Sequence, residues 1–294
     1  SGKDADAMQA VADDPAALRR TMHGAPLWAR TATVAAGPIF NFVMSAAIFT
    51  AVALSQGVMR DPLTVAEMVA LPGEDLGVLP GDELIEVAGV PVPSYGDADA
   101  WDQFRAALPQ QAELDYGLRR DGAEITVTGP YLYPPYVRGV VPRSAAADAG
   151  LMQADVIVAV DGVPLVSFDQ LKVHVEAADG RALTLDVWRG GENVQVELAP
   201  RRTDEPQADG SFATNWRIGI IGGMAFEPAT ETAGFGEALA AGSYQVWAVV
   251  ETSLSGLKHM IAGKISTCNL SGPIGIAETS GAMASQGAER VVRF

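Results

Sequence analysis

The longest apolar stretch of the chain runs from Thr31 to Met59 without a charged residue, and Arg30 and Arg60 bracket it. A membrane-spanning helix needs about 20 apolar residues, so this run can cross a bilayer with some tilt. It starts too far from the N-terminus and lacks the small-residue cleavage pattern of a signal peptide. The alternative is a core helix of a soluble domain. We predict a transmembrane helix at 31–59, preceded by a cytoplasmic segment at 1–30.

Flanking charges orient this span. Three arginines precede it with no acid after Asp14, whereas acidic residues follow it: Asp61, Glu67, Glu74 and Asp75. Basic flanks remain in the cytoplasm. The residues after 60 are therefore predicted on the opposite side of the membrane.

Three residues of the span are unusual for an inert anchor. Gly37 permits close helix approach, and Pro38 frees a backbone carbonyl. Asn41 lies one turn after Gly37 on the same face, and a carboxamide in hydrocarbon is costly unless it is paired. Polar residues at membrane depth are candidates for function. The alternative is that Asn41 only joins two helices.

The exported part contains an internal repeat. Residues 77–94 align with 150–167 at a constant offset of 73, with seven of eighteen positions identical, and residues 120–127 align with 189–196. Each copy predicts an alternating strand, a glycine turn, a helix and a hairpin with glycine at its tip. The two helices carry apolar faces, Trp101, Phe104 and Leu108 in the first copy and Phe168, Leu171 and Val175 in the second.

The remaining segments differ in polarity. Residues 202–235 are rich in turn formers and are predicted as a linker or exposed loop. Residues 236–266 place an apolar stripe on one helix face, interrupted by charges, which predicts an amphipathic helix at the membrane surface or packed against the repeats. Residues 267–294 are expected to lead into a further membrane helix.

Composition narrows the classes of function. The formal net charge is −16 with a pI near 4.5, so nucleic acid is not an expected partner. Cys268 is the single cysteine, which excludes an intrachain disulfide. A length of 294 residues suits two or three small domains, and the ends of the sequence suggest a fragment of a longer protein.

Residues 137–165 resemble a bacterial PDZ domain of the kind found in envelope proteases. The resemblance implies two tandem PDZ domains, at 61–130 (a degenerate copy) and 131–201, each a small twisted β-sandwich with helices. A PDZ groove binds an extended C-terminus by strand addition. In the second copy the resemblance places the peptide carboxylate near 136–139, with a groove wall on α-helical residues. The implied peptide-binding residues are Tyr136, Val137, Arg138, Gly139, Val140, Leu171 and Val175. The alternative is that both copies are spacers whose grooves are filled by the protein itself.

Residues 30–42 resemble the second core helix of the site-2 proteases, and 269–281 resemble the segment leading to the third. The order of span, two PDZ domains and amphipathic helix is similar to the sigma-E-regulating bacterial members of that family. The resemblance implies an intramembrane zinc metalloprotease in which Gly37, Pro38 and Asn41 face the active-site helix. The family's His-Glu-x-x-His and Leu-Asp-Gly motifs do not occur in this sequence, so the zinc ligands and catalytic residues are expected outside it and the fragment alone is expected to be inactive.

The predicted fold is therefore α+β: one transmembrane helix, two tandem PDZ domains and a C-terminal amphipathic helical region. The resemblance implies cleavage of single-span membrane proteins, such as an anti-sigma factor or a signal-peptide remnant, in a multi-pass protein of the bacterial inner membrane with periplasmic PDZ domains acting as a size gate. Two alternatives are a non-enzymatic membrane-anchored PDZ scaffold and an envelope serine protease. The scaffold leaves residues 37–41 unexplained, and no Gly-x-Ser-x-Gly motif supports the serine protease.

Overall fold

The computed structural model describes residues 26–73, 77–94, 97–207 and 211–262. It is an α+β structure that divides into two compact units. One unit is Ser1–Gly57 with Thr232–Glu251, and the other is Val58–Glu231 with Thr252–Phe294. Each is described by itself below.

The first unit contains the long helix α3 (Leu27–Gln56). At 1.5 Å per residue its 30 residues extend about 45 Å, enough to cross a bilayer. In the described part of the chain it is the one helix long and apolar enough for that role, which confirms the predicted apolar helix. The hydroxyls of Thr31, Thr33 and Thr50 donate to carbonyls four residues earlier, so they are satisfied within the helix.

The N-terminal part of a second helix, α7 (Phe235–Ile261), also belongs to this unit. Gly242 of α7 lies against Thr50 of α3, and a Cβ at Gly242 would meet the Thr50 hydroxyl at 2.5 Å. Only glycine allows this approach, which is how small residues bring membrane helices together.

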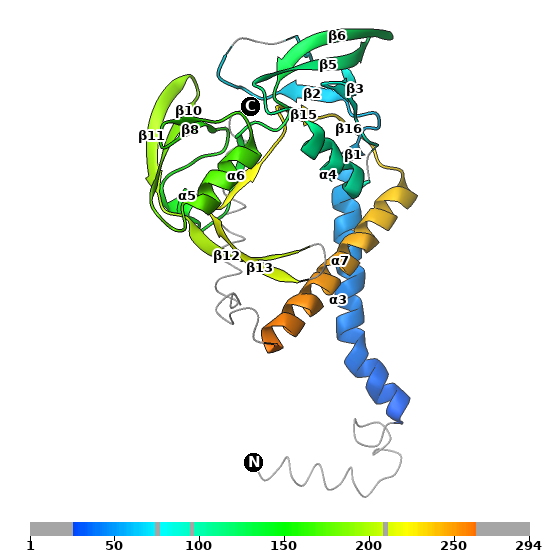
Figure 1. Cartoon of the computed structure of the whole chain (residues 1–294). Coiled ribbons are helices and arrows are strands. Elements are labelled where there is room, and N and C mark those ends of the chain that lie inside the picture. The colour runs from blue at the N-terminus through cyan, green and yellow to red at the C-terminus, as the bar shows by residue number, and fades with distance from the viewer. Residues whose placement is uncertain (1–25, 74–76, 95–96, 208–210, 263–294) are drawn as a thin grey trace, which may run out of the picture. The chain divides into compact units, whose positions relative to one another are not determined.

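The second unit contains both repeats, and each repeat forms one four-stranded antiparallel sheet (Figure 1). The first has the order β4-β3-β5-β6, built from β3 (Glu83–Val87), β4 (Val90–Pro91), β5 (Glu113–Arg120) and β6 (Ala123–Pro130), with α4 (Ala98–Ala107) beside it. The second has the matching order β9-β8-β10-β11, built from β8 (Val156–Val160), β9 (Val163–Pro164), β10 (Leu183–Arg189) and β11 (Glu192–Leu198), with α6 (Phe168–Ala177).

Separate hydrophobic cores fill the two repeats. In the first repeat, Phe104 of α4 and Leu108, the residue after its end, are buried, and Trp101 packs against this core, as the helical spacing predicts. A short helix, α5 (Ala145–Asp148), precedes β8 in the second repeat. The described residues between β2 (Val65–Met68) and β3 include no such helix, consistent with the degenerate sequence of the first copy.

The prediction of a linker or exposed loop at 202–235 is wrong, because this part of the chain contains five strands. These are β12 (Arg201–Pro206), β13 (Phe212–Arg217), β14 (Ile220–Gly222), β15 (Phe226–Pro228) and β16 (Thr230–Glu231). β12 and β13 form a hairpin, whereas the next three strands pair with earlier parts of the chain. Turn-forming residues dominate the local sequence, and pairing with distant strands overrides that local pattern.

The pairing of these strands differs from the predicted domain boundaries. β14 pairs with β7 (Val137–Val140) of the second repeat, and β15 returns to pair with β2 of the first. β16 then pairs with β1 (Val58–Met59), where the second unit begins. The second repeat is thus inserted within the first, and the boundaries 61–130 and 131–201 each leave out a strand that completes the repeat.

Candidate functional site

The apolar helix α3 carries the three residues singled out from sequence. Pro38 lies inside α3, one turn before Phe42, and the helix continues through it. Gly37 has open space where a Cβ would stand, and Asn41 is exposed. Gly37 and Asn41 fall about 40° apart around the helix at 100° per residue. Within the described residues this face of α3 is uncovered.

The predicted peptide edge at Tyr136–Val140 includes β7, and β7 is already paired with another strand along this edge. Ile220 pairs with Val140 and Ile221 with Gly139, so β14 fills the position expected for a bound peptide. On its other side β7 meets the second repeat, because the Val137 N–H donates to the Asp155 carbonyl. Strand addition beside Val140 therefore requires β14 to leave, and the prediction of a free edge there is wrong.

Leu171 and Val175 are core residues and not walls of an open groove. They are 2% and 3% exposed and pack with the residues of β8 and β10. Ile218 and Ile220, just before and within β14, join the same core. The helical face predicted from the sequence is correct, but it is covered by the strand that the sequence analysis placed in a linker.

Two glycines let β14 lie this close to the repeat. A Cβ at Gly222 would approach the ring of Phe168 at 2.7 Å, at the start of α6. Gly219 has a φ of 83°, and a Cβ there would overlap the side chain of Ser144. The run Ile218–Gly223 consists of three isoleucines and three glycines, and that composition is the signal that could have identified it as a close-packed strand.

A buried ion pair occurs in each repeat, at positions that the repeat keeps identical. Asp82 receives two hydrogen bonds of 2.7 Å from Arg120, and Asp155 receives two of 2.7 Å from Arg189. Each aspartate also accepts the backbone N–H three residues earlier, and each arginine also donates to a glycine carbonyl. Burial acts to raise the pKa of Asp82, but the hydrogen bonds from Arg120 and from the Leu79 N–H leave that pKa below its ordinary value.

The β12–β13 hairpin is anchored to α6 by charge and by an aromatic ring. Arg217 donates to both carboxylate oxygens of Glu205 and also to Glu176 of α6. The Trp216 indole N–H donates to Asp179, and a Cβ on Gly180 would touch the Trp216 ring. This places the hairpin firmly at the C-terminal end of α6. The local sequence predicts an exposed segment here and assigns these residues no role.

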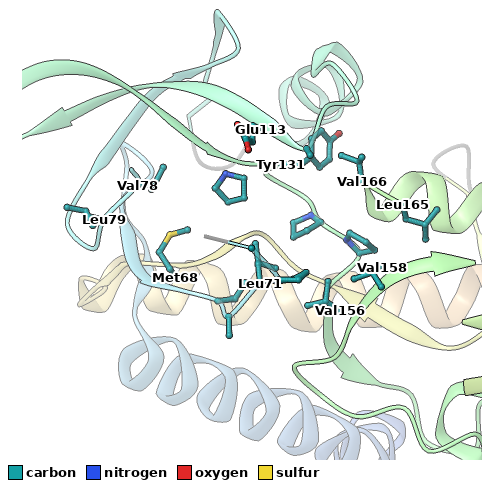
Figure 2. Close-up of a pocket in the computed structure, with 18 of the residues that line it drawn as sticks. Met68, Leu71, Val78, Leu79, Glu113, Tyr131, Val156, Val158, Leu165 and Val166 are labelled. Carbon is teal, nitrogen blue, oxygen red and sulfur yellow. The ribbon is translucent and has the colours of Figure 1, made fainter. Parts of the chain in front are cut away.

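A cavity of about 710 Å³ lies between the two repeats (Figure 2). Its walls come from the end of β2 and the following loop, from the connector between β6 and β7, and from β8 and the residues after β9. Apolar side chains dominate, and Glu113 and Tyr131 contribute the polar groups. The volume falls in the range of small-ligand and side-chain pockets in proteins.

Metal ligands are absent from the described part of the chain: no group of three or more His, Cys, Asp or Glu residues there could hold an ion. His174 and His259 instead use Nδ1 toward backbone carbonyls of their own helices. His23 and Cys268 lie outside the described residues, as does the predicted segment 269–281. The residues that the structure describes do not fit a zinc site.

Comparisons with known proteins identify relatives over most of the chain. A sequence model described as Peptidase family M50 matches residues 4–294. The regulator of sigma-E protease RseP of Escherichia coli is 27% identical over 88% of this chain and 62% of its own length. The metalloprotease MmpA of Caulobacter vibrioides is 26% identical over 81% of this chain and 56% of its own length.

A protein of Rhizobium meliloti that carries the name of a zinc metalloprotease is 26% identical over 94% of this chain and 54% of its own length. The chain thus spans between about half and two thirds of these relatives. Among solved structures, a PDZ domain of an SdrC-like protein from Listeria monocytogenes matches at 20% identity, covering 31% of this chain and 86% of its own, with a TM-score of 0.23.

Proposed function

The chain belongs to Peptidase family M50, and we propose that it is the central part of a membrane-embedded zinc metalloprotease that cleaves single-span membrane proteins. The family match over residues 4–294 carries the proposal. Relatives named as zinc metalloproteases extend beyond the length of this chain. Zinc would be held by residues that these relatives have outside the matched part, and it supplies the activated water for peptide hydrolysis.

In this proposal α3 is one wall of the intramembrane site. Gly37 lets a catalytic helix approach closely, and the carboxamide of Asn41 faces the site on the same side. Asn41 has both donor and acceptor groups, so it can hold a substrate backbone that has left its helical hydrogen bonding. The protein would lie in a bacterial inner membrane, with the repeats in the periplasm.

The pair of repeats acts as a size gate in this proposal. β14 covers β7, and Leu171 and Val175 are buried, which supports bulk and position over peptide reading as their role. The gate would exclude substrates that still carry large periplasmic domains, such as an untrimmed anti-sigma factor. The alternative, a non-enzymatic membrane-anchored scaffold, gives no role to the Gly37–Asn41 face.

Replacement of Asn41 tests the enzymatic proposal in the full-length protein. Asn41→Ala should lower cleavage of a single-span model substrate at least tenfold while the protein level stays unchanged, because one oriented hydrogen-bonding group at a reaction centre contributes about that much or more. Ser55→Ala is the matched control, since its hydroxyl only bonds the Val52 carbonyl near the end of α3. Equal turnover by both variants would reduce Asn41 to a helix-packing residue.

A further inference from the structure

The cavity between the repeats has rigid, apolar walls. Five of its lining residues are prolines: Pro72, Pro80, Pro130, Pro134 and Pro135. Proline has no backbone N–H and no side-chain rotamer freedom to lose, so these walls offer apolar contact at little entropic cost. Figure 2 shows Met68 and Leu71 on one side of the cavity and Val156 and Val158 on another.

Among the lining residues that the structure describes, one carries a carboxylate. Glu113, in the first residue of β5, is exposed, and among the residues that the structure describes it has no ion-pair partner. The other polar lining group is Tyr131, whose hydroxyl oxygen accepts a hydrogen bond from Gln110 at 2.8 Å. An apolar cavity beside one unpaired carboxylate matches a ligand that has a large apolar group next to a cation.

The charge distribution of the chain favours the same ligand. Residues 58–231 contain 28 acidic and 12 basic residues, so the entire net charge of −16 falls in the part of the chain with the repeats. The parts of the chain before residue 58 and after residue 231 together contain equal numbers of acidic and basic residues. A surface with this excess of negative charge attracts cationic peptides and repels anionic ones.

We propose that this cavity binds an extended peptide segment in which large apolar side chains alternate with cationic ones, with the apolar side chain inside and the cation at Glu113. Alternation suits an extended chain, because successive side chains point to opposite sides. The walls belong to both repeats and to the connector between them, so a bound peptide would hold the two repeats together. The proposal does not rest on the proteolytic function, because binding is measured on this chain alone.

The proposal is tested by fluorescence anisotropy of a labelled peptide that is titrated with the whole chain in zwitterionic phosphatidylcholine nanodiscs. The probe is a fluorescein-labelled eight-residue peptide of alternating leucine and arginine. Two comparison peptides replace arginine by glutamate or leucine by serine. The leucine–arginine peptide should bind, and each comparison peptide should bind at least tenfold more weakly, because each lacks one of the two complementary features.

Variants locate the binding. Leu79→Ser should weaken it about fivefold, because Leu79 is an exposed lining residue whose backbone N–H bond to Asp82 does not involve its side chain. Glu113→Gln should weaken it about threefold. Glu192→Gln, on the β10–β11 hairpin away from the lining residues, is the charge-matched control and should change nothing.

Three results would overturn the proposal. Equal binding of the serine–arginine peptide would reduce the interaction to charge alone. Unchanged affinity in Leu79→Ser, with an unchanged melting curve, would place the peptide elsewhere. Displacement of the peptide by lysophosphatidylcholine, with Leu79→Ser weakening the lipid instead, would assign the cavity to an acyl chain.

Discussion

Asp155 and Arg189 form a buried ion pair in which two parallel hydrogen bonds of 2.7 Å join the carboxylate to the guanidinium. Asp155 is completely buried, and its second oxygen also accepts the Met152 N–H. The same arrangement joins Asp82 to Arg120 in the other repeat. The pair ties the turn before the central strand to the hairpin at the end of the repeat, so each repeat closes on itself through this contact.

Removal of the arginine should therefore be strongly destabilising. Arg189→Ala leaves a buried carboxylate without its partner, and we expect a loss of about 3–5 kcal/mol in the unfolding free energy of the second repeat. Arg181→Ala is the matched control, because Arg181 pairs with Asp161 at the same distance of 2.7 Å but at an exposed site. That variant should lose no more than about 1 kcal/mol. Urea unfolding followed by tryptophan fluorescence distinguishes them, and equal losses would contradict the argument.

Acid should destabilise the first repeat through Asp82. Its pKa in the folded protein lies below the ordinary value of 3.8, so the folded state binds a proton less readily than the unfolded chain. The stabilisation that ionised Asp82 gives the folded state is complete above pH about 4 and is lost as the pH falls through the lowered pKa. Melting temperatures measured from pH 7 to pH 2 should fall in that acidic window. Asp82→Asn should start less stable and lose less in the same window; an unchanged slope would assign the acid sensitivity to other groups.

Gly219 should tolerate no side chain. Its φ of 83° costs an L residue about 1–2 kcal/mol, and a Cβ would also overlap Ser144. Gly150→Ala is the control, because Gly150 has a φ of 75° and open space around a Cβ. Gly219→Ala should lose more stability than Gly150→Ala, and the double variant Gly219→Ala with Ser144→Gly should recover part of the difference. Equal losses without recovery would leave the backbone angle as the sole cause.

The charge asymmetry around α3 predicts the topology of the membrane protein. A reporter fused at Gln207, in the exposed turn after β12, should be active as alkaline phosphatase and silent as a cytoplasmic reporter. A fusion before Arg30 should give the opposite pattern. Reversal of both would overturn the orientation and, with it, the periplasmic gate.

Local pattern predicted the parts of this fold that depend on local sequence. The apolar run of α3, the burial of Phe104 and Leu108, and the matching order of the two sheets follow from periodicity and from the repeat. The Asp–Arg pairs were also visible, since both residues are identical between the copies. Their offsets differ, 73 for Asp82 and Asp155 but 69 for Arg120 and Arg189, so a single constant offset did not bring them together.

The insertion of one repeat in the other was not predictable in this way. β15 pairs with β2 across more than 150 residues, and β14 with β7 across about 80. β14 and β15 are three residues long; Gly219 and Gly223 beside β14, and Pro228 at the end of β15, are locally typical of turns. Pairing of such short strands is decided by the surface they cover, which the local sequence does not describe. Helical periodicity placed Leu171 and Val175 on the correct face, but periodicity does not indicate which distant strand covers that face.

The buried position of Leu171 also determines how a gate can be distinguished from a peptide receptor. A charge at Leu171 would unfold the second repeat and could not separate the two roles. Ile221 of β14 is 53% exposed beside Gly139, so Ile221→Asp changes the outer face of that strand and keeps the core. In the full-length protein, a receptor acting through this face would lose cleavage of every substrate in Ile221→Asp. A gate would keep cleavage of a trimmed substrate within about twofold.

Removal of the gate completes this test. Deletion of 61–200 would leave β14 and β15 without their partners, because those partners are β7 and β2. Met59 and Thr230 are paired in the ladder of β1 and β16, so the chain can be rejoined there by a short glycine–serine link that replaces residues 60–229. The gate predicts that this variant cleaves an untrimmed substrate with a bulky periplasmic domain, which the intact protein does not cleave. If the variant cleaves only the trimmed substrate, the repeats do not exclude substrates by size; if it cleaves neither, while Ile221→Asp also fails, the repeats deliver the substrate.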